Sequence, residues 1–105
     1  MCNTKVLAQT GSAFISHCKD CKTIFIWQNN ILLNFSPEDF TAFKRMLYGL
    51  DFEDCSFRFQ DNASRIIIKT PKPEISFTFT EEEWDDFNQA IDEAAYMQEV
   101  YDLIG

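Results

Sequence analysis

The sequence has few of the residues that break or loosen a folded chain. It contains only three Gly and three Pro among 105 residues, which leaves little room for disordered segments or long loops. No apolar run approaches the ~20 residues that cross a bilayer, and residues 1–8 lack the sustained apolar stretch of a secretory signal. We therefore expect one domain over residues 1–105, cytoplasmic and without a membrane partner, whose four Cys stay reduced.

Basic residues are absent from the last third of the chain. From Pro73 onward there are ten Asp and Glu but no Lys or Arg, whereas residues 1–72 hold seven acids and nine bases. The net charge of −8 is thus concentrated near the C-terminus. Such a surface repels phosphate backbones, so we expect no nucleic-acid partner. A solvated acidic helix face explains the pattern, and a basic protein partner is the alternative.

Groups suited to catalysis are equally scarce. The chain has a single His, His17, and no Gly-rich loop that could cradle a phosphate. His17 and Cys18 are neighbours in a predicted strand, so their side chains point to opposite faces and cannot meet as base and nucleophile. The acids that follow Thr80 complement the dipole of a predicted helix. We therefore expect a protein that is not an enzyme, with no catalytic or cofactor-binding residue.

What the chain does contain is an internal repeat at an offset of 44 residues. Residues 30–43 align with residues 74–87, and each segment begins with the alternating apolar residues of a half-buried strand. Ser36 and Thr80 then occupy N-cap positions, each with an acid three residues later, so each strand leads into a helix. The aligned apolar pairs are Ile31/Ile75, Leu33/Phe77, Phe35/Phe79, Phe40/Trp84 and Phe43/Phe87.

The repeat predicts an α+β fold made by a tandem β-β-β-α duplication. Short connections favour antiparallel neighbours, which gives an antiparallel sheet of about six strands with two helices on one face. Two separate three-stranded units that pack helix to helix are the alternative. The repeat halves are about 13–50 and 56–95, and residues 96–105 form a C-terminal helical extension.

Three large apolar residues fall on the strand face that the helices leave uncovered, namely Phe25, Trp27 and Ile67. A sheet covered on one side is normally polar on the other, so an open patch of these residues would bind a partner or a second copy. The alternative is that residues 1–10 or the C-terminal extension cover them. Tyr101 belongs to that extension, which we expect to pack against the first helix or across a dimer interface.

A Cys-x-x-Cys turn is the only motif with the spacing of metal ligands. Cys18 and Cys21 resemble half of a zinc ribbon, but tetrahedral zinc needs four ligands. The other soft donors are His17, Cys55 and Cys2. A turn without metal is the favoured interpretation. A zinc site made by Cys18, Cys21 and two of these donors, or shared across a dimer, is the alternative.

The chain resembles a family of small bacterial proteins that is classed as a domain of unknown function. The matching features are the Cys18–Cys21 turn, the apolar strand Ile24–Trp27, the strand-to-helix segment Phe35–Phe40, and Arg65–Pro71 before the second strand–helix unit. The resemblance covers roughly residues 14–95 and implies no activity. The sequence therefore favours a non-enzymatic protein–protein interaction or regulatory module that self-associates, with a small zinc-binding protein as the alternative.

Overall fold

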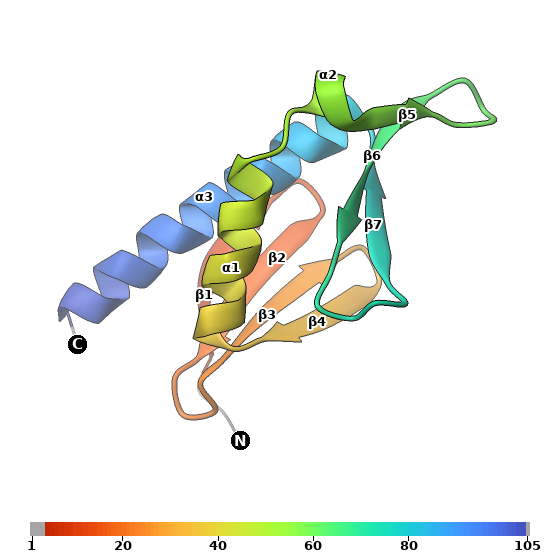
Figure 1. Ribbon diagram of the computed structural model, residues 1–105. Coiled ribbons are helices and arrows are strands. Elements are labelled where there is room, and N and C mark those ends of the chain that lie inside the picture. Colours follow the sequence, from red (N-terminus) through yellow and green to blue (C-terminus); the bar gives the residue numbers. More distant parts are fainter. Residues whose placement is uncertain (1–3, 105) are drawn as a thin grey trace.

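A computed structural model describes residues 4–104 as a mixed α+β chain (Figure 1). The α+β class is confirmed, and the order β-β-β-α occurs twice, as β2-β3-β4-α1 and, after a short helix, as β5-β6-β7-α3. The elements in chain order are β1 (Thr4–Thr10), β2 (Ala13–Cys18), β3 (Thr23–Gln28), β4 (Ile31–Phe35), α1 (Pro37–Tyr48), α2 (Phe52–Cys55), β5 (Ser56–Arg58), β6 (Ser64–Lys69), β7 (Ser76–Phe79) and α3 (Glu81–Ile104).

The strands form two antiparallel sheets in place of the expected single sheet of about six strands. The first sheet has the order β1-β2-β3-β4 and the second β5-β6-β7. The repeat-related strands β4 and β7 do not pair with each other. Two helices, α1 and α2, separate β4 from β5 in the chain, and α2 leads directly into β5. The second sheet therefore starts beyond the far end of α1 and lies at an angle to the first (Figure 1).

The edge strand β1 was not expected from the sequence. It pairs with β2, and its register shifts between Val6 and Ala8. Because of this shift, Leu7 and Ala8 are both buried in the core although they are neighbours in the chain. A β-bulge of this kind interrupts the alternation of apolar residues by which a strand is recognised.

Local capping fixes where both long helices begin. The Ser36 side chain accepts a hydrogen bond from the Asp39 backbone N–H at 3.0 Å, as predicted. At the second helix, the Thr80 N–H donates to Glu83 Oε1 at 2.8 Å, and the Glu83 N–H donates to Thr80 Oγ1 at 3.4 Å, which is a capping box. Gly49 ends α1 with φ of −84°, so no left-handed residue is used there.

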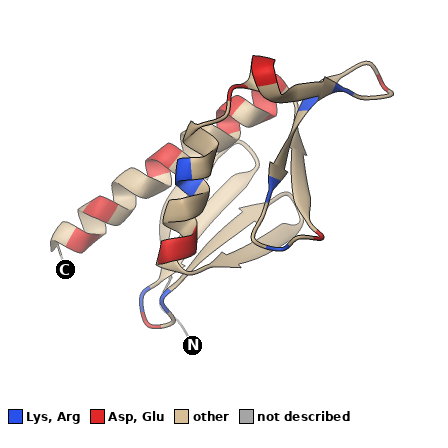
Figure 2. Cartoon of the chain, in the orientation of Figure 1, with Lys and Arg blue, Asp and Glu red and all other residues tan. Residues whose placement is uncertain are grey.

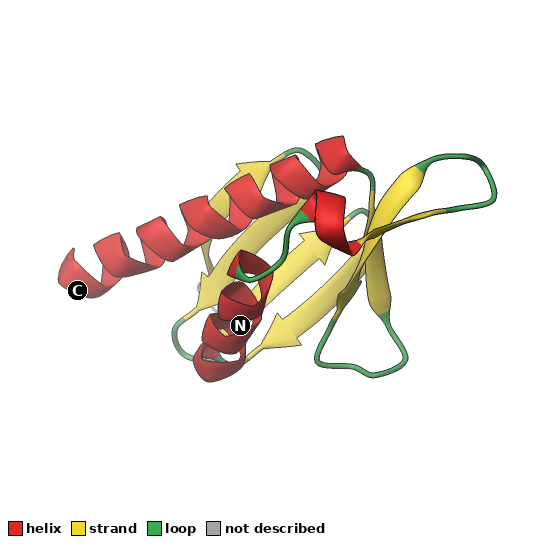
Figure 3. Ribbon diagram, turned by 45° about the horizontal axis from the view of Figure 1, so that its top comes forward, coloured by secondary structure: helices red, strands yellow, loops and turns green. Residues whose placement is uncertain are grey.

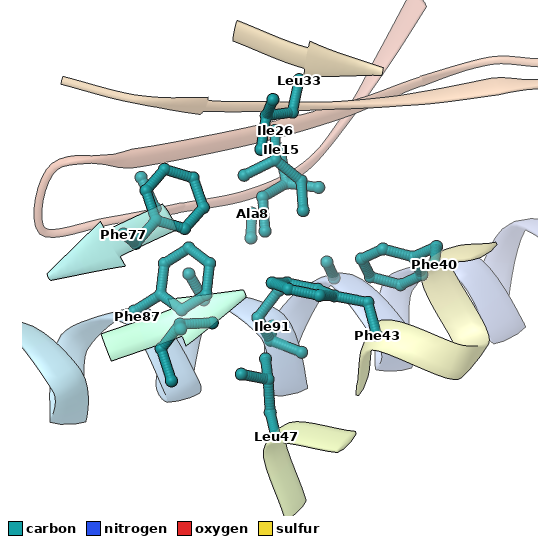
Figure 4. Packing of buried hydrophobic residues seen from close by; sticks show 14 of the residues in the cluster. Ala8, Ile15, Ile26, Leu33, Phe40, Phe43, Leu47, Phe77, Phe87 and Ile91 are labelled. Atoms are coloured by element: carbon teal, nitrogen blue, oxygen red, sulfur yellow. The ribbon is translucent and has the colours of Figure 1, made fainter. Parts of the chain in front are cut away.

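One hydrophobic core joins the two sheets and the two long helices (Figure 4). Phe87 of α3 lies at its centre, and its ring centroid is 4.8 Å from that of Phe79, 5.6 Å from that of Phe77 and 6.2 Å from that of Phe43. Both repeat halves therefore bury their apolar faces against the same residue. The first sheet contributes Ala8, Ile15, Ile24, Ile26, Leu33 and Phe35 to this core.

The last helix is twice as long as the first and projects beyond the edge of the first sheet (Figure 1). It has 24 residues, of which Trp84, Phe87, Ala90, Ile91 and Ala94 are buried. Acidic residues interrupt its sequence throughout. Within residues 4–104, no helix combines the length and the apolar character that crossing a bilayer requires.

Candidate interaction surface

The first sheet is covered by helices on one side only (Figures 1 and 3). The helix α3 contacts β1 and β2, and α1 contacts β3 and β4, through residues that point into the core. The opposite side, here called the outer face, carries no helix of the described chain. Strand register assigns to the outer face Thr4, Val6, Gln9, Phe14, Ser16, Cys18, Thr23, Phe25, Trp27, Leu32 and Asn34. All of these are at least partly exposed except Cys18, which is buried.

Large apolar side chains lie next to one another on this face. Trp27 of β3 stands directly opposite Phe14 of β2 and Leu32 of β4, and cross-strand neighbours of this kind are in contact range. Trp27 is 52 % exposed and Leu32 is 56 % exposed, while Phe14 is half-buried. In the next row of paired residues, Val6 of β1 and Phe25 of β3 stand on either side of Ser16. We call Val6, Phe14, Phe25, Trp27 and Leu32 the apolar patch.

Among residues 4–104, none that the register assigns to the outer face is charged. Its polar members are Thr, Gln, Ser, Cys and Asn only. The acidic residues of the C-terminal third gather instead along α3, on the other side of the sheet (Figure 2). The charge asymmetry seen in the sequence thus becomes an asymmetry between two sides of the molecule.

The structure brings together two of the three residues predicted to share an open face. Phe25 and Trp27 both belong to the apolar patch. Ile67 belongs to β6 of the second sheet, where it stands opposite Thr78. There it lines an open cavity of about 520 Å³ together with Phe57 and Arg65, among others. Ile67 is therefore exposed as expected, but on a different sheet.

Sequence reasoning missed Val6, Phe14 and Leu32 as members of the patch. The signal for Leu32 was available, because Gln28 pairs with Ile31 across a two-residue turn. That turn length sets the register that places Leu32 opposite Trp27. The signal for Val6 was not available, because the bulge in β1 hides the strand.

The C-terminal extension contacts the first sheet through Tyr101. Tyr101 is half-buried, and Lys5 Nζ lies 4.7 Å from the centroid of its ring. Met97 also packs against the core from the same helix. Leu103 and Ile104 are 86 % and 73 % exposed. The extension therefore contributes contacts through its first turns only, and none of these contacts covers the outer face.

The predicted metal ligands are distributed over different parts of the fold. Cys18 is a buried free thiol whose Sγ accepts the Cys21 backbone N–H at 3.4 Å, and the two residues form the expected turn. His17 stands opposite Ile24 on the other face of β2. Cys55 is a free thiol in α2, not in a strand, and α2 lies far from the β2–β3 turn (Figure 1). Cys2 lies outside the described residues.

Within residues 4–104, no group of three or more His, Cys, Asp and Glu side chains is placed to hold a metal ion. Cys21 is disulfide-bonded, so the expectation that all four Cys stay reduced is wrong for this residue. The zinc alternative needs four ligands, and the described part of the turn supplies one free thiol, that of Cys18. Zinc binding therefore stays a prediction.

In the described part of the chain, Tyr48 and Asp61 have perturbed pKa values, and both lie away from the apolar patch. Tyr48 Oη donates a hydrogen bond of 2.6 Å to Asp92 Oδ1, and this bond raises the pKa of Tyr48. The pKa of Asp61 is lowered, first by the hydrogen bond from the Ala63 N–H and then by Arg65, whose Nη1 lies 2.9 Å from Asp61 Oδ2. The first contact links α1 to α3, and the second closes the β5–β6 turn, so both have structural explanations.

Comparison with known proteins identifies the family. The model of a family described as a family of unknown function (DUF6686) matches residues 1–103, so the chain belongs to that family. The expected resemblance to a domain of unknown function is confirmed. No curated protein and no solved structure matches the chain.

Proposed function

We propose that this member of the DUF6686 family is a non-enzymatic interaction module that self-associates through its apolar patch. The observation that carries the proposal is a face to which the described residues bring no charge, and on which Val6 is 48 % exposed and Trp27 and Leu32 slightly more. A sheet with one solvated side normally alternates to polar residues there. Large contiguous apolar residues on such a side are typical of a protein interface.

Electrostatics favour a second copy of the chain as the occupant. The net charge of −8 repels another copy wherever acidic surfaces meet. Two outer faces bring no charge into contact, and they hold the acidic α3 helices on the outside of the pair. With sheets ~10 Å apart and one helix diameter of ~10 Å on each side, the two α3 axes would be about 30 Å apart. That distance exceeds the ~8 Å Debye length at physiological salt, so the repulsion is largely screened.

The size of the face predicts a weak dimer. Four strands spaced ~4.8 Å apart, with about six residues of ~3.3 Å each, span roughly 19 by 20 Å. This footprint is about 400 Å² per copy, or half of the ~800 Å² of a standard stable interface. We therefore expect a dimer that forms in the micromolar range or above and dissociates on dilution, as suits a regulatory module.

Sedimentation velocity over about 1 µM to about 1 mM tests the proposal, because this range brackets the Kd of weak dimers. We expect the parent protein to pass from monomer to dimer and Trp27→Ser to stay monomeric. The matched control is Tyr96→Ser, which removes an exposed aromatic residue from α3 and should dimerise like the parent. A parent protein that stays monomeric throughout, or a Trp27→Ser variant that dimerises normally, would overturn the proposal.

A further inference from the structure

A small cavity lies where the start of α3 meets the turn between β1 and β2. It has a volume of about 20 Å³, which is room for one water molecule or one ion. Its lining is rich in oxygen atoms and contains one apolar side chain. The lining residues are Thr10, Ser12, Gln28, Glu83, Asp86 and Phe87.

Gln28 is the polar residue that makes this cavity unusual. It follows Ile24 and Ile26 on the inward-facing side of β3, and only 6 % of its surface is exposed. Its Oε1 has no hydrogen-bond partner among residues 4–104. A buried carbonyl oxygen without a partner costs free energy. A ligand in the cavity that interacts with an oxygen lone pair would remove this cost.

Two residues with carboxylates line the same cavity as Gln28. Glu83 and Asp86 are three residues apart on α3 and so share one side of the helix. One oxygen of Glu83 accepts the capping hydrogen bond from the Thr80 N–H, which holds the side chain at the helix start. Asp86 takes part in no ion pair within residues 4–104.

The turn between β1 and β2 fixes the position of Asp86. Gly11 adopts a φ of +60° there. A Cβ added to it would lie 2.9 Å from Asp86 Cβ and 3.0 Å from Asp86 Oδ2. Only a residue without a side chain allows the backbone to approach the carboxylate so closely. The two strands, their turn and α3 thus meet around a single set of oxygen atoms.

We propose that this cavity binds a single hard cation, with Ca²⁺ as the preferred ion. The residues that line it carry two carboxylates, the Gln28 carboxamide oxygen and the hydroxyls of Thr10 and Ser12. The Thr10 hydroxyl donates a hydrogen bond to Glu93 Oε2 at 3.2 Å, which leaves its oxygen lone pairs for a cation. An all-oxygen set of mixed charge suits Ca²⁺, which accepts six to eight oxygen ligands in irregular geometry, better than Mg²⁺ or the softer Zn²⁺. Solvent would supply the remaining ligands.

The position of the cavity also limits its affinity. The N-terminus of α3 carries a partial positive charge of roughly half a unit, which opposes a cation. The two carboxylates contribute two negative charges and outweigh it. Glu81, Glu82 and Asp85 on neighbouring positions of α3 add a further negative potential. A net attraction remains, and the expected binding is that of a moderate-affinity site.

Titration of chelator-treated full-length protein with CaCl₂ tests the site by calorimetry and by the thermal unfolding midpoint. A background of about 0.15 M KCl screens non-specific binding to the acidic surface. We expect one Ca²⁺ per chain and a higher unfolding midpoint. Asp86→Asn should weaken binding about tenfold or more, because affinity follows the number of charged ligands. The matched control, Asp85→Asn, changes the neighbouring exposed acid and should bind like the parent.

A second variant separates the cation from a buried water molecule. Gln28→Met keeps a chain of similar size in the core and removes the carbonyl oxygen, so we expect it to weaken Ca²⁺ binding while the protein stays folded. The proposal is overturned if the parent binds no Ca²⁺, which would leave a single water as the occupant. It is also overturned if Asp85→Asn and Asp86→Asn lose the same affinity, which would indicate a diffuse acidic surface.

Discussion

The two faces of the first sheet are built from similar residues but stand in different surroundings. The inner face presents Ile15, Ile26 and Leu33 to the helices, and all three are buried. The outer face presents Phe25, Trp27 and other large apolar residues, and no described helix covers them. Folding explains the apolar residues of the inner face, because they form the core. The apolar residues of the outer face exceed what folding requires, and this difference is the basis of the proposed self-association.

The largest expected difference in stability is between variants of Ile26 and Trp27, which are neighbours in β3 but point to opposite faces of the sheet. Ile26→Ala should lower the free energy of unfolding by about 2–5 kcal/mol, because it leaves a cavity in the core. Trp27→Ala should lower it by less than about 1 kcal/mol in dilute, monomeric protein, because half of that side chain is already in solvent. Urea unfolding at low protein concentration measures both. Equal losses would mean that the two faces do not differ in their role in folding.

The C-terminal extension gives a second contrast, between its packed and its exposed residues. Truncation after Ala95 removes the buried parts of Met97 and Tyr101 and should cost about 1–3 kcal/mol of stability, from the apolar area lost. Truncation after Asp102 removes the exposed end of α3 and should leave the thermal midpoint unchanged. If both truncated chains melt like the parent, the Lys5–Tyr101 contact contributes nothing measurable.

A charge placed on the outer face should break association and leave folding intact. Leu32→Glu puts a carboxylate on each of the two facing surfaces and should weaken dimerisation by about tenfold or more, or ~1.4 kcal/mol. Phe57→Glu is the control, since it changes an equally exposed residue on the second sheet. Sedimentation equilibrium compares the two variants. Similar dissociation constants would place the interface elsewhere.

The smallest expected effect concerns the link between α1 and α3. Tyr48→Phe removes the hydrogen bond to Asp92, which should cost at most about 0.5 kcal/mol because the contact is exposed. The folded-state pKa of Tyr48 is raised above its usual value of 10.0. The contribution of this hydrogen bond to stability is therefore complete below pH 10, and it disappears as the pH rises through the folded-state pKa of Tyr48. Chemical unfolding at neutral and alkaline pH measures it, with Tyr96→Phe as the control.

Local signals were sufficient to predict β2, β3, β4, both long helices and their caps. These elements depend on alternation, N-cap residues and short turns, all of which lie within a few positions in the sequence. The strand β1 could not be predicted, because Leu7 sits in a bulge that breaks alternation. The four-residue α2 is too short to show a period.

Pairing between distant segments could not be predicted either. The repeat shows that β4 and β7 are equivalent, but equivalence does not specify whether they share a sheet. For the same reason the sequence predicted only part of the apolar patch. Phe25 and Trp27 could be assigned to one face from the alternation within β3 alone. Placing Val6 and Phe14 beside them requires the pairing register of β1, β2 and β3. The oxygen-lined cavity also joins three segments, and its one sequence signal is Gln28 at an inward position of an apolar strand.

The central claim is that a second copy covers the apolar patch, and isotope-filtered nuclear Overhauser spectroscopy on a mixture of labelled and unlabelled chains tests it most directly. In a two-fold pair, the same patch lies on both sides of the interface. We predict intermolecular contacts between the rings and methyl groups of Phe14, Trp27 and Leu32 at high protein concentration. Intermolecular contacts from α3 alone, or none at a concentration near 1 mM, would contradict the account.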